Sequence, residues 1–245
     1  MSTGIKSIEC LYHPVMFRTK YRTVRQRGSN GVGGTLRLNL GCGLQAPAGW
    51  TNIDRSPGLI LDRLPGAKSV LYRIGLLADA HMVTWPRSIK LADVTKALPY
   101  PTGTVAAIYS SHMLEHIYFD QALALLGECH RVLQPDGILR VALPDVRVFA
   151  RQLLSATEDE AAAAGLKFTQ LLNAGPLHKP NRRQKLTQFV GASPHRWQPT
   201  SALVINMMRE AGFADPQSRE FMVGDLPGLA EVEHRPEGLF VEARR

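Results

Sequence analysis

Gly41, Cys42 and Gly43 form a Gly-Cys-Gly turn that could bring the backbone close to a ligand. The turn directly follows residues 36–40, whose alternating apolar side chains predict a β-strand. Glycines after a strand let the chain bend sharply and leave no Cβ in the way of a ligand. We expect a helix to follow and to offer free N–H groups to an anion. The third glycine of a dinucleotide fingerprint is absent, so this turn alone is also typical of an ordinary loop.

Two aspartates stand at the ends of the next expected strands. Asp54 ends the segment 49–54, where a carboxylate can accept hydrogen bonds from both hydroxyls of a ribose. Asp93 lies in the segment 89–94, where it could take an adenine amino group. Taken singly, Asp54 could cap a surface turn and Asp93 could cap a helix. In chain order after the glycine turn, the two acids favour a ligand that contains a nucleoside.

The run from His112 to His116 follows the expected fourth strand and carries three titratable side chains, the third being Glu115. Asp145 follows the expected fifth strand on the same sheet edge. A His–Asp pair would hold the imidazole in one tautomer and stabilise its charged form. Such a pair suits a general base that takes a proton from a hydroxyl. We predict His112, His116 and Asp145 as catalytic residues, with capping or packing as the alternative for the histidines and pairing with an arginine for Glu115.

Other aromatic and imidazole side chains lie further along the chain. His178 and His195 are second candidates for the base, and Trp197 could stack on the face of a sugar ring. A His/Asp cluster could instead hold a divalent ion. The sequence shows no tight spacing of metal ligands, so we predict no metal site.

The elements that must position these residues alternate between strands and helices. Such alternation predicts an α/β fold with a doubly wound, mostly parallel sheet, in which ligands bind at the carboxyl ends of the strands. Residues 56–90, with one helical piece near 71–77, and residues 146–195 are expected to be acceptor-side insertions or a lid. The expected strands are 36–40, 49–54, 89–94, 105–110, 138–143 and 238–243, and the expected helices are 120–133 and one from Thr200 to Gly212.

Charge divides the 245 residues into a basic N-terminal arm and linker, residues 1–35, and a domain, residues 36–245. A basic arm can bind nucleic acid, an anionic membrane surface or a charged substrate, or it can simply be solvated. A single acidic residue, Glu9, stands in the arm against Lys6, Arg18, Lys20, Arg22, Arg25 and Arg27.

Cysteine usage and hydropathy indicate the compartment. Three widely spaced cysteines fit neither a disulfide framework nor a zinc knuckle. The sequence shows no secretion signal and no apolar run of about 18 residues that could span a membrane. We therefore expect a cytoplasmic protein.

Several segments together resemble the class I S-adenosylmethionine-dependent methyltransferases, most closely the broad branch that methylates small molecules and glycans. The resemblance covers about residues 36–145, and it implies a Rossmann-like, doubly wound, mostly parallel seven-stranded sheet with helices on both faces. HRWQPTSALVINMMREAGF and LFVEA near the C-terminus are also similar, whereas residues 146–195 match poorly. The main segments are LNLGCG, NID, the Asp93 segment, LPYPTGTVAAIYSSHMLEH and ECHRVLQPDGILRVALPD.

The resemblance also implies residue roles toward S-adenosyl-L-methionine. The glycine turn Gly41–Gly43 with Cys42 would pass under the methionine part, and Asp54 would hold the ribose. Asp93 and the Val94 backbone would bind adenine, while Ser111 and His112 would line the floor near the sulfonium. Asn39 departs from the family, which usually has an acid there that helps to hold the cofactor's ammonium group. Asn39 can still accept a hydrogen bond but brings no charge.

The leading expectation is O-methylation of a saccharide or small hydroxylated metabolite, as in the synthesis of methylated polysaccharide or glycolipid. The first alternative is an RNA or DNA methyltransferase that uses the basic arm. A D/N-P-P-Y-type tetrapeptide, common in methylation of base amines, is absent after the fourth strand, and this disfavours nucleic acid as a partner. The second alternative is a scaffold that binds the cofactor without catalysis, at which Asn39 hints.

Overall fold

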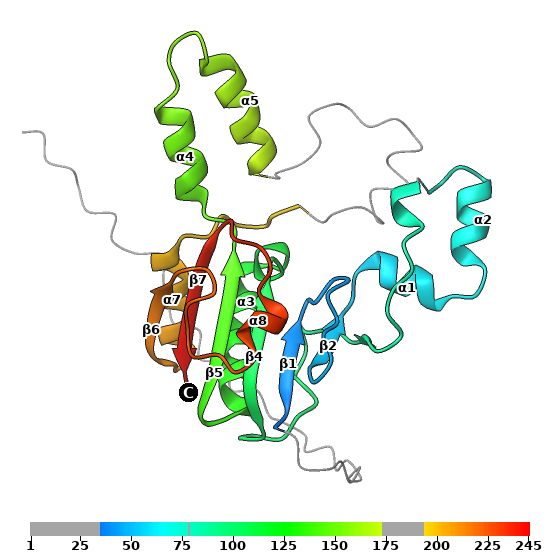
Figure 1. Ribbon diagram of the computed structural model, residues 1–245, viewed down its shortest axis with the longest axis vertical. Helices are drawn as coiled ribbons and strands as arrows, with labels where there is room; N and C mark the ends of the chain where they lie inside the picture. Colours follow the sequence, from blue (N-terminus) through cyan, green and yellow to red (C-terminus); the bar gives the residue numbers. More distant parts are fainter. Residues whose placement is uncertain (1–34, 78, 173–193) are drawn as a thin grey trace, which may run out of the picture. The chain divides into compact units, whose positions relative to one another are not determined.

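One mixed sheet organises the residues that the computed structural model describes, which are 35–77, 79–172 and 194–245 (Figure 1). Its seven strands lie in the order β3-β2-β1-β4-β5-β7-β6. Neighbouring strands are parallel, except that β7 runs antiparallel to β5 and β6. This is the mostly parallel seven-stranded sheet expected from the sequence. The bounds are β1 Arg37–Leu40, β2 Thr51–Asp54, β3 Lys90–Leu91, β4 Val105–Ser111, β5 Leu133–Leu143, β6 Ala214–Arg219 and β7 Leu239–Arg244.

The strand order reverses between β1 and β4. From β1 the chain proceeds to β2 and β3 on one side, and then returns to place β4 and β5 on the other side. Leu38 of β1 lies in register with Thr51 of β2 and with Ile108 of β4. In open α/β sheets, ligands bind outside the carboxyl ends of the strands at such a reversal. The segments that follow Leu40 and Ser111 therefore border the expected ligand site.

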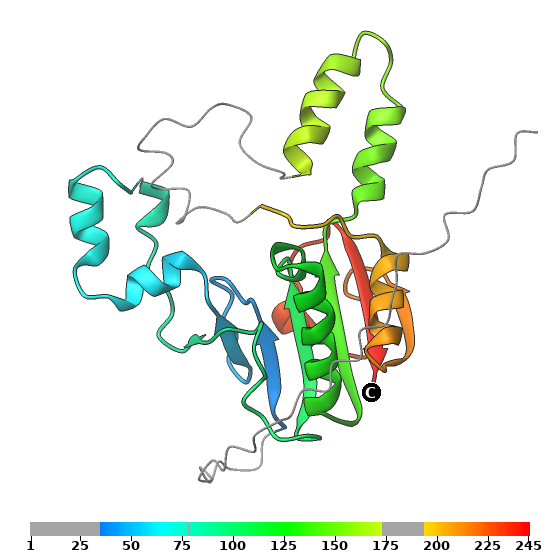
Figure 2. The same ribbon diagram turned by 180° about the vertical axis from the view of Figure 1, so that it is seen from behind.

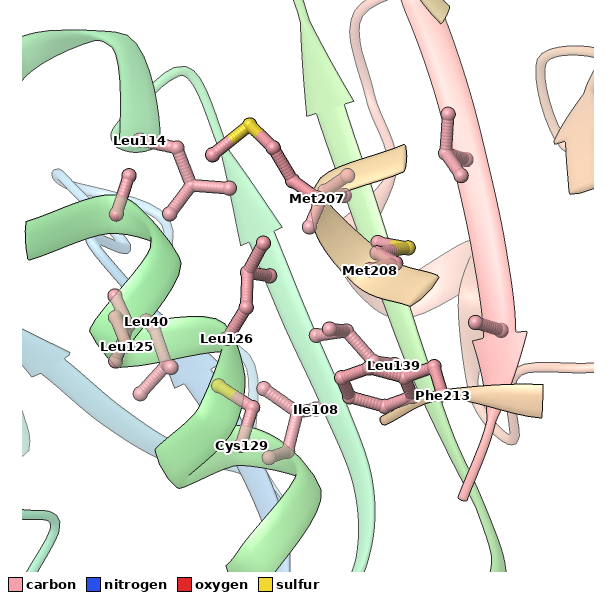
Figure 3. Close-up of a cluster of buried hydrophobic side chains, with 14 of the residues drawn as sticks. Leu40, Ile108, Leu114, Leu125, Leu126, Cys129, Leu139, Met207, Met208 and Phe213 are labelled. Carbon is pink, nitrogen blue, oxygen red and sulfur yellow. The ribbon is translucent and has the colours of Figure 1, made fainter. Parts of the chain in front are cut away.

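Two amphipathic helices cover one face of the sheet, α3 (Phe119–Val132) and α7 (Ser201–Glu210), as Figure 2 shows. Their apolar stripes were predicted from periodic spacing, and both helices are confirmed. Each Leu, Ile or Met fully buried in this layer contributes about 1.5–3 kcal/mol of hydrophobic stabilisation. Figure 3 shows the buried side chains between the helices and the strands, among them Ile108, Leu125, Leu126, Cys129, Leu139, Met207, Met208 and Phe213.

The ends of α7 follow the predicted signals. The Thr200 hydroxyl accepts a hydrogen bond from the backbone N–H of Leu203 at 3.2 Å, which satisfies one of the free donors at the helix start. Gly212 follows the helix with a φ of 97°, a left-handed conformation that favours glycine. The helix expected from Thr200 to Gly212 is therefore present with its predicted caps.

The opposite face of the sheet is covered by the short helix α8 (Leu229–Val232) and its flanking loops. Trp50, Tyr109 and Phe240 are buried in the core cluster on this side. Arg140 of β5 is also fully buried, and two of its nitrogens donate to the two carboxylate oxygens of Glu233, both at 2.7 Å. A bidentate ion pair therefore ties the loop after α8 to the centre of the sheet.

The expected helix after the glycine turn is absent from the structure. Residues 41–50 form turns and loops only, because β2 already begins at Thr51. The first helix, α1 (Pro57–Arg63), follows β2 instead and carries proline at its start. The insertion 56–90 also holds α2 (Ala67–Arg73) and the 3₁₀ turn η1 (Asp79–His81), where one helical piece was expected near 71–77.

Two further helices, α4 (Val146–Leu154) and α5 (Ala161–Leu171), follow β5 in the segment that was expected to serve the acceptor. Phe149 of α4 and Phe168 of α5 line a hollow of about 330 Å³ between them. The edge strand β6 was not predicted, since its mostly exposed sequence ADPQSR lacks an apolar alternation.

Two predictions from the sequence concern residues that the structure does not describe. The basic arm, up to residue 34, and His178 lie outside the described residues. Among the described residues, no helix is both long and apolar enough to cross a membrane.

Candidate active site

The glycine turn connects the ends of β1 and β2. The backbone N–H groups of Gly41 and Cys42 both donate to the carbonyl of Ile53, at 2.9 and 3.2 Å. Gly41 and Gly43 have φ values of 66° and 55°, which L side chains rarely adopt. A Cβ on Gly41 would overlap the side chain of Met113, whereas a Cβ on Gly43 would point into open space. Gly41 thus admits Met113, and Gly43 leaves its surface open to a ligand.

Asp54 is fixed beside this turn with 4% of its surface exposed. Its Oδ2 accepts a hydrogen bond from the Gly43 N–H at 2.8 Å. Its Oδ1 accepts from the backbone N–H and the hydroxyl of Ser56, at 2.6 and 2.5 Å. A carboxylate has about four acceptor positions. Oδ2 therefore keeps one position for a ligand hydroxyl, and a second becomes available on Oδ1 when the Ser56 hydroxyl rotates away.

Asp93 lies after β3, next to the end of β2. The Ala92 N–H donates to the Asp54 carbonyl at 3.3 Å, so the two acids stand at adjacent strand ends. The hydroxyl of Thr95 donates to Asp93 at 2.6 Å, and Arg55 pairs with the other oxygen at 3.0 Å. The Thr95 hydrogen bond is the main cause that holds the pKa of Asp93 below its usual value, with the Arg55 charge acting in the same direction. The carboxylate is ionised at neutral pH.

Asn39 is buried on β1, and its amide holds the loop beyond the glycine turn. The Asn39 amide nitrogen donates to the Gln45 carbonyl at 3.1 Å and to the Asn52 side-chain oxygen at 3.0 Å. Asn52 in turn donates to the carbonyls of Pro47 and Trp50, both at 3.1 Å. An ionised acid at position 39 would have no N–H to donate and would face two oxygens. Asparagine, rather than the acid usual in the family, therefore suits this position, because only the amide can donate these two hydrogen bonds.

Cys42 is buried with Leu59 and Ile89 rather than exposed on the turn. Burial raises the pKa of the Cys42 thiol to about 12, and the nearby charge of Asp54 adds to the effect. The thiol is neutral and unreactive at physiological pH. Only the backbone of Cys42 remains for contact with a ligand. Val94 is likewise partly buried against the main core, so its side chain packs inward.

The segment after β4 lies against the glycine turn through the Met113 side chain. Ser111 is the last residue of β4, and the backbone N–H of His112 donates to the Ala142 carbonyl at 2.9 Å. His112 has a φ of 49°, which is uncommon for a residue other than glycine. Strained backbone of this kind persists where the surrounding structure fixes it, and it is found most often at functional sites.

Glu115 is the carboxylate that faces both predicted catalytic histidines. It is fully buried in the 3₁₀ turn η2 (Leu114–His116). Its Oε1 lies 3.5 Å from Nδ1 of His112 and 4.0 Å from Nε2 of His116. Among the described residues, no ion pair joins Asp145 to either histidine. Asp145 instead caps α4 by accepting a hydrogen bond from the Arg147 N–H at 2.9 Å. The expected His–Asp pairing is thus replaced by a His–Glu arrangement.

The segment 194–197 packs onto η2. The Arg196 N–H donates to the Glu115 carbonyl at 2.7 Å, and the Trp197 indole donates to the Leu114 carbonyl at 3.2 Å. Trp197 packs edge-on against Phe119, so its ring contributes to the core rather than offering an open face to a sugar. The His195 ring lies 4.9 Å from that of His116. Burial is the main cause that lowers the pKa of His195.

A family model described as a methyltransferase domain matches residues 38–141. The match runs from β1 into β5, and it includes the glycine turn, both aspartates and η2. Residues 38–141 are therefore similar to a methyltransferase domain, and the sheet that holds them has the Rossmann-like order of the class I S-adenosylmethionine-dependent methyltransferases. This likeness points to S-adenosyl-L-methionine as the cofactor.

Several solved structures are similar to this chain at low sequence identity. PigF with SAH is 16% identical, with 86% of this chain and 50% of that chain covered and a TM-score of 0.42. A methyltransferase from Mesorhizobium loti is 20% identical, with 87% and 92% covered and a TM-score of 0.43. One from Archaeoglobus fulgidus is 12% identical, with 86% and 87% covered and a TM-score of 0.47. This chain thus spans half the length of the PigF chain. A comparison with curated proteins found no match.

Sequence reasoning placed the candidate cofactor residues at one edge of the sheet but missed the residues that hold them in place. Ser56 and Asn52 hold Asp54 and Asn39 in place. Ser56 could have been found, since a serine two residues after an acid commonly closes a turn on it. The packing of Glu115 against segment 194–197 could not have been predicted, because the sequence around η2 carries no pattern that indicates this long-range contact.

Proposed function

We propose that this protein is a methyltransferase that transfers the methyl group of S-adenosyl-L-methionine to a hydroxyl of a saccharide or a small hydroxylated metabolite. The observation that carries this proposal is the pair formed by Nδ1 of His112 and Oε1 of Glu115, which lie 3.5 Å apart. Met113, between them in the chain, packs against Gly41 of the glycine turn. An acceptor hydroxyl must lose a proton when it is methylated, and this pair puts a base with a buried counter-charge beside the cofactor loop.

The described residues fit the cofactor. The open side of Gly43 gives room for the methionine part to lie on the backbone. Asp54 keeps acceptor capacity for the ribose hydroxyls, and the ionised Asp93 can accept from the adenine amino group. In the proposed arrangement, the Val94 backbone borders adenine, and Ser111 with His112 lines the floor. Asn39 acts through the loop that it holds, and the Cys42 side chain stays in the core.

S-adenosyl-L-methionine supplies an electrophilic methyl carbon on a sulfonium, so the protein mainly has to align the acceptor oxygen with it. His112 takes the hydroxyl proton on Nε2, because its Nδ1 faces Glu115. The buried carboxylate stabilises the imidazolium that forms and fixes the ring orientation. His116 has less freedom for this role, since its Nδ1 lies 3.4 Å from the Pro194 carbonyl and its Nε2 faces Glu115.

The acceptor is expected to approach from the side of α4 and α5. These helices follow the β5 end, and the insertion 56–90 flanks the cofactor edge beyond β2. Both segments were expected to serve the acceptor, and they remain the part of the chain to which we assign its recognition.

A methyl-transfer screen tests the proposal. The purified protein is supplied with radiolabelled S-adenosylmethionine and with monosaccharides, glycolipids, phenols or RNA as acceptors. His112→Asn is the informative variant, because asparagine tolerates the left-handed backbone at this position but is not a base. We expect labelling of a hydroxylated acceptor and a loss of about 100-fold or more in kcat for His112→Asn. His234→Ala, at an exposed histidine, is the matched control. Methylation of RNA alone, or full activity of His112→Asn, would overturn the proposal.

A further inference from the structure

Three side chains that carry potential metal-ligand atoms converge beside His112, after the end of β4. Glu115 and His116 come from η2, and His195 comes from the segment that packs on it. One potential ligand atom from each lies within 4.8 Å of the other two. Glu115 is fully buried, and the two histidines are partly buried. Two imidazoles and one carboxylate form a donor set that binds divalent transition metals and leaves coordination positions for water or substrate.

The buried atoms of this cluster have no hydrogen-bond partner. This holds for Oε1 and Oε2 of Glu115 and for Nδ1 of His195. A charged carboxylate that is removed from water without donors is strongly destabilised unless a cation neutralises it. Groups of this kind in a folded protein call for an explanation, and an ion bound by this cluster is one.

The backbone around the cluster orients its imidazoles as a metal site requires. Nδ1 of His116 lies 3.4 Å from the carbonyl of Pro194. The tautomer that donates from Nδ1 to this carbonyl leaves the Nε2 lone pair free, and Nε2 lies 4.0 Å from Oε1 of Glu115. Histidine ligands of metals usually donate their other N–H to a carbonyl or carboxylate in this manner. The Pro194 carbonyl is thus placed to orient His116 as a ligand.

Hydrogen bonds hold the two segments together independently of an ion. The Arg196 N–H donates to the Glu115 carbonyl, and the Trp197 indole donates to the Leu114 carbonyl. His195 is thereby kept next to η2 by its own neighbours in the chain. A site whose ligands are already positioned loses little conformational entropy when it binds.

We infer that Glu115, His116 and His195 bind one divalent transition-metal ion, with Zn²⁺ as the reference ion. The nitrogen-rich donor set favours Zn²⁺, Co²⁺ or Fe²⁺ over Mg²⁺ and Ca²⁺, which prefer oxygen ligands. This site goes beyond the proposed methyl transfer and differs from the prediction, made from the sequence, that the chain has no metal site. Glu115 has two carboxylate oxygens, so it can serve the ion and still face His112.

The test measures metal binding directly. The full-length protein is treated with a chelator, the chelator is removed, and Zn²⁺ is titrated by calorimetry with Mg²⁺ as a comparison. Co²⁺ is added in parallel, and its visible absorption reports the ligand geometry. We expect one Zn²⁺ per chain and weaker binding of Mg²⁺. Replacing a ligand, as in His195→Ala or Glu115→Gln, should weaken Zn²⁺ binding by at least about 100-fold, since even outer-shell changes weaken metal sites by about 10- to 100-fold.

Matched variants keep this test decisive. His234→Ala removes an exposed histidine and should leave the Zn²⁺ affinity unchanged. His195→Ala lies in an irregular, partly buried segment, so it is expected to fold even where Glu115→Gln does not. Unchanged Zn²⁺ affinity in folded His195→Ala would overturn the inference, because the ion would then bind elsewhere. An absence of Zn²⁺ binding by the wild-type chain would also overturn the inference. Glu115 would then interact only with the imidazoles of His112 and His116. Neither result depends on methyl transfer.

Discussion

The amide of Asn39 donates a hydrogen bond to the side-chain oxygen of Asn52, at 3.0 Å, between the neighbouring strands β1 and β2. The same amide nitrogen donates to the Gln45 carbonyl, and Asn52 holds two further carbonyls of the loop. The two asparagines therefore fix the loop that begins with the glycine turn. Asn39 is the residue that departs from the family pattern, and its neighbour Asn52 explains the departure.

Replacing Asn39 by aspartate is expected to destabilise the fold. Aspartate would place a carboxylate against two acceptor oxygens and would leave them without a donor, at a cost of about 1–3 kcal/mol. The free energy of unfolding in urea is the measurement. Asn206→Asp makes the same change at an exposed position of α7 and should alter stability by less than about 0.5 kcal/mol. Equal stability of the two variants would show that the amide contacts of Asn39 do not hold the loop.

The two glycines of the turn should respond differently to alanine. Both have left-handed backbone, so both alanine variants carry a similar conformational penalty of about 1–2 kcal/mol. Gly41→Ala also overlaps Met113 and should lose more stability than Gly43→Ala. Gly43→Ala should instead mainly weaken the binding of S-adenosylmethionine. Urea unfolding and calorimetry of both variants separate the effects.

A second change tests the cause assigned to Gly41. Replacing Met113 by glycine in the Gly41→Ala background should recover part of the lost stability, because both overlapping atoms of Met113, Cβ and Cγ, are removed. If the double variant is less stable than the wild type by the full sum of the two single losses, the contact between Gly41 and Met113 is not responsible.

Much of the fold could be predicted because its signals are local. The apolar stripes of α3 and α7 and the strands around Leu38 and Ile108 follow from short-range periodicity. The helix expected after Gly43 was wrong, since a glycine turn does not by itself tell how soon the next strand begins. Strand β6 was missed because its residues are polar and lie at the sheet edge.

In the candidate site, too, the residues at strand ends could be predicted from the sequence, whereas those brought together by long-range packing could not. Asp54 and Asp93 could be placed from their positions at strand ends, which the topology brings together. The cluster of Glu115, His116 and His195 depends on the packing of segment 194–197 against η2, which is a long-range contact without a local sequence signal. Asp145 was predicted in the place that Glu115 takes, because strand order alone does not show which of two nearby carboxylates turns inward.

The thiol of Cys42 should resist alkylation in the folded protein. Its pKa is raised to about 12, so the thiolate that reacts is scarce at pH 8, and the side chain is also buried. Labelling with iodoacetamide, followed by mass spectrometry of the Cys42 peptide, should show little reaction in buffer and full reaction in urea. Rapid labelling in buffer would mean that the side chain lies open at the turn.

The same raised pKa has a consequence for stability. The neutral thiol is favoured in the folded state, so its contribution is complete below the unfolded pKa of about 9 and is lost as the pH rises from there toward 12. Replacing Cys42 by alanine should reduce the fall in unfolding free energy over this range. An identical alkaline profile in the variant would contradict this assignment.

The buried pair of Arg140 and Glu233 should be essential for stability. Glu233→Gln leaves the arginine charge buried without its bidentate partner, which typically costs about 3–5 kcal/mol. Urea unfolding measures the loss. Glu237→Gln changes an exposed glutamate in the same region and should be nearly neutral. A loss below about 1 kcal/mol for Glu233→Gln would show that Glu242, which lies 3.4 Å from Arg140, compensates.

Calorimetric titration with S-adenosyl-L-methionine tests the account most directly. The wild-type chain is expected to bind one equivalent. Asp54→Asn should bind about tenfold or more weakly, because a hydrogen bond to a charged group contributes about 1.5–3 kcal/mol. Thermal unfolding of both proteins shows that the variant is folded and that the wild type is stabilised by the cofactor. No heat and no thermal shift with the wild-type chain, or equal affinity of a folded Asp54→Asn, would contradict the cofactor site at the ends of β1 and β2.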